Sequence, residues 1–322
     1  MNKVSNISDL PDIQNQISAI KLKINKVGIY NVRTRVKIRY DHKDYEFTPV
    51  ISAVVELPSN QRGTHMSRNS ETIEEVIDEI SHKPASKIEE ITKNMVIKLL
   101  EKHDYTNNVE VTLKGILVID VFQEDKGKVQ KSLDLEVKTI GTRNIKEPLK
   151  HYINHFITVS IYGMIACPCG QELSKDYAKD ILLKRKDELH LDSESINKIL
   201  NLVPMATHSQ RCKGTITIEI PDNYDLDLLD MINIIENSMS GVTYNILKRP
   251  DEGKLIRYSH LNPRFVEDCI RLMAVNLYSK YKDLPLKNFV KLRVESYESI
   301  HTHNAIAEIT TTIGDLKKVL EK

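Results

Sequence analysis

The sequence predicts an α+β protein in which antiparallel strands and helices follow one another in the same order twice. Several stretches alternate apolar and polar residues with a period of two, and others repeat with the helical period of 3.6. The order strand, strand, helix, helix, strand, strand occurs before residue 142 and again, with an insertion, after residue 151. We therefore expect a flexible leader at 1–20, a first unit at 21–147 and a second unit at 148–322.

In the first unit, a long hairpin precedes two helices and two further strands. Its apolar and polar residues alternate over 32–40, a polar turn follows at 41–44, and the second strand lies within 47–57. Helices are expected from Ser70, capped by Asn69 or Ser70, and again after Pro84. The closing strands are expected at 109–121 and 131–140.

In the second unit, a strand at 152–166 leads into a polar helical insertion that ends near residue 202. A strand at 214–220, a helix from about residue 226 and a helix starting at Asn262-Pro263 follow. Strands at 289–295 and 305–311 close the unit. The insertion therefore interrupts a second copy of the first unit's order.

The composition bears on which partners and which cellular compartment are expected for the protein. Lys and Arg number 46 against 45 Asp and Glu, so the net charge of +1 gives no general attraction to nucleic acid or to an anionic membrane. No apolar run approaches the roughly 18 residues of a membrane span, and no signal peptide is apparent at the start. Four cysteines in 322 residues suit reduced thiols, so a cytoplasmic protein is expected.

The most informative motif is Cys167-Pro168-Cys169-Gly170, which is followed far along the chain by His208. Thiolate and imidazole are ligands of a borderline or soft divalent metal, and the spacing lacks the two close pairs of a structural zinc finger. It favours a three-ligand site with one open position. The alternative is that these thiols are small buried residues at a turn, as we expect for Cys212 and Cys269.

Two loops carry charged clusters. The segment 62–68 places Arg62, His65 and Arg68 before a predicted helix, which suits a phosphate ester or is simply a solvated turn. In the segment 248–253, Glu252 either completes a metal set or is a turn carboxylate.

Two further clusters lie near the C-terminal end. Glu267, in the first turn of a predicted helix, either clamps the N–H edge of a purine or pterin or complements the helix dipole at the surface. His301 and His303 project to the same side of an extended segment, where they could transfer protons near pH 7 or form an exposed turn.

Together these motifs resemble the type IB GTP cyclohydrolases, and within them the archaeal MptA branch. The resemblance spans most of the chain from about residue 20 and rests on the segments 62–69, 167–169, 205–211, 248–252, 265–268 and 298–303. It implies the tunnelling fold (T-fold), with two tandem units that each have an antiparallel sheet with two helices on one face. It also implies a homotetramer, or a dimer, with purine or pterin sites at subunit interfaces.

The resemblance implies metal-dependent opening of the guanine imidazole ring of GTP with release of formate, giving 7,8-dihydroneopterin 2′,3′-cyclic phosphate for pterin, tetrahydromethanopterin or folate biosynthesis. One divalent metal per subunit is implied, Fe²⁺ first, with Zn²⁺ or Mn²⁺ as alternatives. The implied ligands are Cys167, His208 and Glu252. The implied catalytic set is Cys167, Cys169 and either His301 or His303, while Glu267 would anchor the guanine.

Charge adds Arg62, Arg68 and Arg211 as phosphate candidates, and His65 joins them in the expected substrate-binding set. Three other functions stay open: the same reaction with 7,8-dihydroneopterin triphosphate as product, a tunnelling-fold nitrile reductase, and a non-catalytic purine- or pterin-binding module. A Glu-Ser-Phe-Lys motif of the reductase type is absent from the sequence, which favours the cyclohydrolase.

Overall fold

The computed structural model describes residues 12–123, 127–144, 146–147 and 150–321, and these form two compact units. Unit 1 comprises Met1–Ile157 with Glu219–Tyr224, and unit 2 comprises Thr158–Ile218 with Asp225–Lys322. The division falls within one strand, β7 (His151–Ala166). The predicted boundary at 147/148 lies partly outside the described residues, as does most of the predicted leader, and both stay predictions.

Unit 1 is built on an antiparallel sheet in the order β1-β4-β5-β6-β7. Its other strands are β1 (Ile24–Arg33), β4 (Val50–Leu57), β5 (Asn108–Gln123) and β6 (Gly127–Arg143). A separate hairpin joins β2 (Val36–Tyr40) to β3 (Lys43–Phe47). The single strand predicted over 32–40 is therefore wrong: β1 ends at Arg33, β2 begins at Val36, and the two strands pair with different partners.

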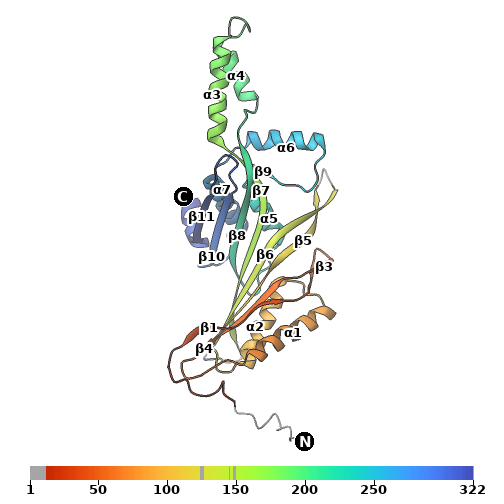
Figure 1. Ribbon diagram of the computed structural model, residues 1–322, viewed down its shortest axis with the longest axis vertical. Coiled ribbons are helices and arrows are strands. Elements are labelled where there is room, and N and C mark those ends of the chain that lie inside the picture. Colours follow the sequence, from red (N-terminus) through yellow and green to blue (C-terminus); the bar gives the residue numbers. More distant parts are fainter. Residues whose placement is uncertain (1–11, 124–126, 145, 148–149, 322) are drawn as a thin grey trace. The chain divides into compact units, whose positions relative to one another are not determined.

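Two helices, α1 (Met66–His82) and α2 (Ile88–Lys102), lie along the sheet of unit 1 (Figure 1). Both carry the predicted apolar stripe, because Ile73 and Val76 of α1 and Ile91, Met95 and Leu99 of α2 are buried. Helix α2 packs on β5 and β6, whose alternate residues, such as Val109, Val111, Leu135 and Val137, are buried. The mixed α+β class and the antiparallel pairing predicted from sequence are confirmed here.

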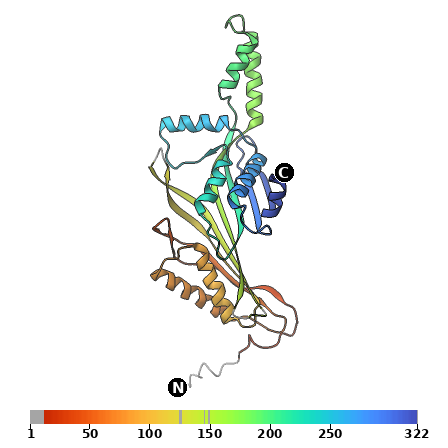
Figure 2. The same ribbon diagram turned by 180° about the vertical axis from the view of Figure 1, so that it is seen from behind.

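Unit 2 continues from the second half of β7 through an antiparallel sheet. The order is β7-β8-β10-β11, with β8 (Ser209–Pro221), β10 (Phe289–Ser296) and β11 (Ala305–Thr312), and the short β9 (Gly241–Val242) pairs with β7. Between β7 and β8 the insertion forms a helical hairpin of α3 (Pro168–Lys184) and α4 (Ser193–Leu202), which lie side by side in both views (Figures 1 and 2).

Four more helices belong to unit 2: α5 (Leu228–Asn237), α6 (Arg249–Leu261), α7 (Val266–Tyr281) and α8 (Ile313–Leu320). Helices α5 and α7 were expected, and they bury Met231, Ile235, Met273 and Leu277 against the sheet core. Neither α6 nor α8 was predicted. The predicted helical insertion is present as α3 and α4, but the prediction of two further helices in the second unit is incomplete, since it omits α6 and α8.

Across the part of the chain that the structure describes, no helix combines the length and apolar character that crossing a membrane would require.

Candidate functional site

The carboxyl end of β7 is the point at which the predicted site residues of unit 2 begin to gather. Cys167 follows β7 as the N-cap of α3, and its thiol accepts a hydrogen bond from the Gly170 amide at 3.4 Å. The Cys167 amide donates to the His208 carbonyl at 3.1 Å, and the Thr207 hydroxyl donates to the Cys167 carbonyl at 2.7 Å. The knuckle and the His208 segment, far apart in sequence, are therefore bound to each other through the backbone.

The ring of His208 is oriented by Gln210. Its Nδ1 lies 3.0 Å from Gln210 Oε1, while the Gln210 amide nitrogen donates to Ser296 Oγ at 3.1 Å and to Glu298 Oε1 at 3.0 Å. Because the amide oxygen can only accept, Nδ1 carries the proton and Nε2 presents its lone pair. Among the described residues Nε2 has no hydrogen-bond partner, so it is available to a ligand.

The pair His301 and His303 lies in the loop between β10 and β11. The two rings stack with centroids 5.1 Å apart and an interplanar angle of 14°, and both are exposed. The prediction that they project to the same side is confirmed. Since Glu298 at the start of this loop contacts Gln210, the histidine loop is connected to the His208 segment.

Glu267 lies in the first turn of α7, close to the same end of β7. The amide of Arg264 donates to the carbonyl of Ala166, the residue before Cys167, at 3.0 Å. The predicted start at Asn262-Pro263 is wrong: α7 begins at Val266, and Asp268 caps it by accepting from the Phe265 amide at 3.1 Å. Glu267 itself is exposed and has no ion-pair or hydrogen-bond partner within the described ranges, so its carboxylate is available.

Glu252 is not brought to Cys167 and His208. The segment expected to be a loop is helical, and it carries Glu252 in the exposed first turn of α6. The other end of α6 is the one fixed near the knuckle, because the Gln171 amide donates to the His260 carbonyl at 2.5 Å. Eight residues of helix separate the two positions by about 12 Å. Throughout the described chain, no three His, Cys, Asp or Glu side chains are grouped closely enough to hold an ion.

The remaining thiols and Arg211 differ in their exposure to solvent. Cys169 is exposed in the first turn of α3, and Arg211 is exposed near the start of β8. Cys212 and Cys269 are fully buried, as predicted, and burial raises the pKa of both thiols, that of Cys269 to about 12. Only Cys167 and Cys169 are therefore accessible thiols.

The cluster of Arg62, His65 and Arg68 belongs to unit 1, where two of its members already have partners. The Arg62 guanidinium donates to Gln16 Oε1 and that of Arg68 donates to the Lys102 carbonyl, each at 2.7 Å. His65 is the N-cap of α1, so the helix starts before the predicted caps. The Nε2 atom of His65 is buried without a hydrogen-bond partner, and it lies at ion-pair distance, 3.7 Å, from Asp12 Oδ1.

Asn69, expected as a cap, instead ties this cluster to the core of unit 1. Its side-chain amide donates to the Ala53 carbonyl at 3.0 Å, and its oxygen lies 2.9 Å from His103 Nε2. The other ring nitrogen of His103 contacts Tyr105, whose hydroxyl reaches Thr64 at 2.5 Å. The motif at 62–69 is therefore a built polar network and not a solvated turn.

Sequence reasoning missed Gln171 and Gln210 as positioning residues. Gln171 lies two residues after Cys169 of the predicted catalytic set, and Gln210 lies two residues after the predicted ligand His208. Amide side chains next to a metal-binding motif are the detectable indication, because a ligating imidazole commonly needs a partner on its second nitrogen.

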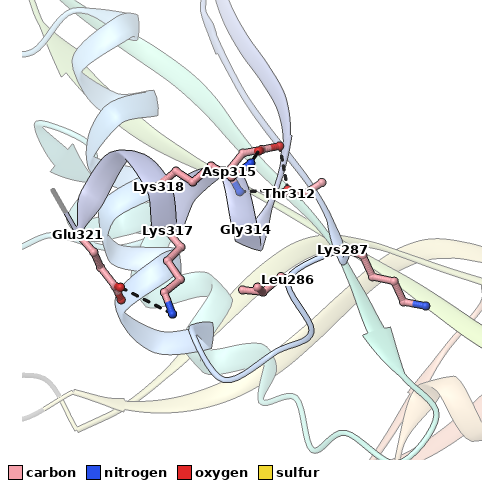
Figure 3. A pocket seen from close by; sticks show the side chains of 8 residues that line it. All are labelled: Leu286, Lys287, Thr312, Gly314, Asp315, Lys317, Lys318 and Glu321. Atoms are coloured by element: carbon pink, nitrogen blue, oxygen red, sulfur yellow. Dashed lines mark hydrogen bonds and ion pairs between the residues drawn. The ribbon is translucent and has the colours of Figure 1, made fainter.

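A surface pocket of about 510 Å³ lies elsewhere in unit 2, beside α8 (Figure 3). Lys317 and Glu321 pair at its rim at 3.8 Å, and Asp315 pairs with Lys318 at 2.9 Å. The residues that line it are Leu286, Lys287, Thr312, Gly314, Asp315, Lys317, Lys318 and Glu321. None of the predicted site residues is among them.

Comparison with known proteins gives a consistent family. The family model described as type I GTP cyclohydrolase folE2 matches residues 10–307. GTP cyclohydrolase MptA of Methanosphaera stadtmanae is 37% identical over 314 residues, covering 97% of this chain and 98% of that protein. GTP cyclohydrolase MptA of Methanocaldococcus jannaschii is 37% identical over 316 residues, covering 96% and 97%.

Among solved structures, a uricase from Bacillus fastidious aligns with 93% of this chain and 97% of its own. The sequence identity is 8% and the TM-score is 0.47, which is too low to establish a shared fold.

Proposed function

Because the chain belongs to the type I GTP cyclohydrolase family, we propose that it opens the imidazole ring of GTP and releases formate, as a step of pterin biosynthesis. The proposed product is 7,8-dihydroneopterin 2′,3′-cyclic phosphate. The observation that supports the proposal is the assembly at the end of β7, where Cys167, His208 and the helix that carries Glu267 meet through backbone hydrogen bonds.

The proposed cofactor is one divalent ion per subunit, Fe²⁺ first, with Zn²⁺ or Mn²⁺ as alternatives. Two of the three proposed ligands fit: Cys167 is an accessible thiol, and His208 presents an unpaired Nε2 while Gln210 holds Nδ1. Glu252 is the third proposed ligand, and it requires movement of the first turn of α6. When bound, the ion supplies Lewis acidity that makes hydroxide available near neutral pH.

The chain's own residues have separate proposed tasks. The Glu267 carboxylate accepts the two parallel N–H groups on the pyrimidine edge of guanine, which orients C8 toward the knuckle. His301 or His303 delivers a proton to N7, which makes C8 electron-poor toward water. After C8 leaves as formate, the ribose recloses onto the exposed nitrogens. Cys169 is an accessible thiol beside this site and is proposed to act with the histidines.

The triphosphate requires cations. Within unit 2, Arg211 is exposed and, in the described part of the chain, has no side-chain partner, so it is the best-supported phosphate ligand. Arg62, His65 and Arg68 of unit 1 are the other proposed phosphate-binding residues, and they would exchange their present contacts for phosphate oxygens.

We further propose that both units are tunnelling-fold units and that the enzyme is a cytoplasmic homotetramer, or a dimer. An antiparallel sheet with helices packed against it in each unit supports the tunnelling-fold part of this proposal. Light scattering on the purified, metal-loaded protein tests the oligomeric state.

The function is tested by anaerobic incubation of the protein with Fe²⁺ and GTP, followed by formate assay and mass analysis of the product. Chelator-sensitive formate release with the cyclic phosphate mass is expected. A triphosphate mass would establish the alternative product. Chelator-insensitive oxidation of NADPH with a deazaguanine nitrile would establish the reductase, and GTP binding without turnover in Fe²⁺, Mn²⁺ or Zn²⁺ would establish a binding module.

The matched variant is Glu267→Gln, which keeps the shape of the side chain but removes its charge. We expect it to retain the metal of the wild-type protein and to lose at least about tenfold in kcat/KM for GTP, since hydrogen bonds to a charged group contribute roughly 1.5–3 kcal/mol. Turnover equal to wild type would refute the anchoring role.

A further inference from the structure

Arg264 connects three segments that meet at the end of β7. Its backbone amide donates to the Ala166 carbonyl at 3.0 Å, and its guanidinium donates from one nitrogen to the carbonyls of Asn237 and Met239, both at 2.8 Å. Asn237 is the last residue of α5 and Met239 lies just beyond its C-cap, so the guanidinium stands at the C-terminal end of the helix, where a cation also interacts favourably with the helix dipole.

The connection closes into a ring of hydrogen bonds. Ser240, which follows Met239, is fully buried, and its hydroxyl accepts from the Ala166 amide at 3.2 Å. Ala166 is therefore held through its carbonyl by Arg264 and through its amide by Ser240, while Arg264 holds the residue before Ser240. Together these hydrogen bonds fix the relative positions of the three segments more firmly than any one of the bonds would alone.

Two residues with proposed functions lie next to members of this ring in the sequence. Cys167 follows Ala166 directly, and Glu267 lies three residues after Arg264, in the first turn of α7. Asp268, not Glu267, caps the helix, so nothing in the described chain holds the Glu267 carboxylate except the position of its helix. Moving the start of α7 would move that carboxylate relative to the knuckle.

We infer that Arg264 is a positioning residue that sets the preference of the site for a purine with a 2-amino group. The inference rests on the proposed function, in which Glu267 accepts from N1–H and from the 2-amino group of guanine. Hypoxanthine lacks that amino group, so inosine triphosphate offers Glu267 only one of the two donors. If the Glu267 carboxylate is displaced, it can no longer accept from both N1–H and the 2-amino group. The preference for GTP over inosine triphosphate then falls.

The test compares kcat/KM for GTP and for inosine triphosphate in the metal-loaded wild-type protein, Arg264→Lys, Arg264→Ala and Glu267→Gln, together with dissociation constants from calorimetry. Wild type should prefer GTP by roughly tenfold or more, the value of one hydrogen bond to a charged group. Both Arg264 variants should lose most of that preference with unchanged metal content, and combining either with Glu267→Gln should cause no further loss.

The matched control is Asn276→Ala. Asn276 also ties α7 to the end of α5, by donating to Ser238 Oγ at 3.2 Å, but it lies more than two turns beyond Glu267. This variant should lose stability and keep the preference for GTP. Equal losses for both nucleotides in the Arg264 variants, or an equal loss of preference in Asn276→Ala, would overturn the inference.

Failure of the proposed function gives a different result. Wild-type protein that turns over neither nucleotide would overturn both claims, whereas wild-type protein that prefers GTP while Arg264→Lys and Arg264→Ala keep that preference would overturn the role of Arg264 alone.

Discussion

Gly170 is the residue against which both proposed metal ligands lie. Its amide contacts the Cys167 thiol, and a Cβ added there would stand 2.7 Å from Thr207 Oγ1 and 3.3 Å from Cδ2 of His208. Gly170→Ala should therefore displace the His208 segment and weaken metal binding at least about tenfold, as loss of outer-shell support typically does. Titration with Co²⁺, followed by its absorption spectrum, measures the affinity.

The control for Gly170→Ala is Gly253→Ala in α6, where an added Cβ meets nothing within 4 Å. It should leave metal binding unchanged and stabilise the helix by roughly 0.5–1 kcal/mol. Wild-type Co²⁺ affinity in Gly170→Ala would contradict the proposed ligand pair.

Gln210 determines which nitrogen of His208 is free. Gln210→Met keeps the length of the side chain but removes the acceptor of Nδ1–H, so both ring tautomers become available. We expect metal affinity to fall by roughly 10–100-fold, measured by the same titration. Ser299→Ala removes only a 3.5 Å contact with Gln210 Oε1 and should change nothing. An unchanged affinity in Gln210→Met would show that the His208 ring is not a ligand.

At the scale of secondary-structure elements, the sequence predicts those helices in which the buried apolar residues recur with the helical period of 3.6. Helix α2 buries Ile91, Met95 and Leu99 at helical spacing, and it was expected. Helix α6 buries only Ser259, so its sequence carries no stripe from which it could be recognised. The end of β1 at Arg33 could not be predicted either, because apolar and polar residues keep alternating through 34–40 and only the pairing partner of the strand changes.

Arg143 caps helix α2 from the end of β6. Its guanidinium donates to the carbonyls of Thr106 at 3.1 Å and His103 at 3.3 Å, and also to that of Leu100. Arg143→Met removes the donor to the carbonyls of Thr106 and Leu100, while the His103 carbonyl keeps the Thr106 amide, and it should lower the free energy of unfolding of unit 1 by about 2 kcal/mol. Urea unfolding, followed by circular dichroism, measures the change.

The control for this cap is Arg39→Met, which removes the exposed pair with Asp44 at 2.7 Å. It should lower the free energy of unfolding far less than Arg143→Met does, because surface ion pairs contribute little. Equal losses in the two variants would show that capping of α2 is not a significant source of stability.

At the scale of the whole molecule, the sequence predicts the residue types of the proposed site better than it predicts their positions. Cys167, His208 and Glu267 could be named from residue type and motif, and the backbone connects their segments. That Glu252 lies on a helix whose far end contacts the knuckle could not be foreseen, since it depends on the tertiary contact made by Gln171. Position in space is set by such long-range bonds, which leave no periodic pattern in the sequence.

Acid should destabilise the protein through its buried histidines. His103 and His155 are fully buried; burial lowers the pKa of His103 to about 4 and also lowers that of His155. Between about pH 6.5 and pH 4 unfolded His103 binds a proton that folded His103 does not, so the free energy of unfolding falls as the pH falls, by up to about 1.4 kcal/mol per pH unit. The lowered pKa of His155 acts in the same direction.

The pKa of Asp222 is also lowered, because the opposing effect of desolvation is outweighed by the hydrogen bonds from Lys93 and His155, and it acts in the same direction at still lower pH. Urea unfolding at pH 7.5, 6.0 and 5.0 measures the slope. His103→Gln should reduce the slope between pH 6 and pH 5 by about 1.4 kcal/mol per unit, because one titrating group is gone. The exposed His82 offers the comparison: His82→Gln should leave the slope as it is. A free energy of unfolding that stays constant from pH 7.5 to pH 5.0 would mean that these histidines do not remain neutral in the folded protein.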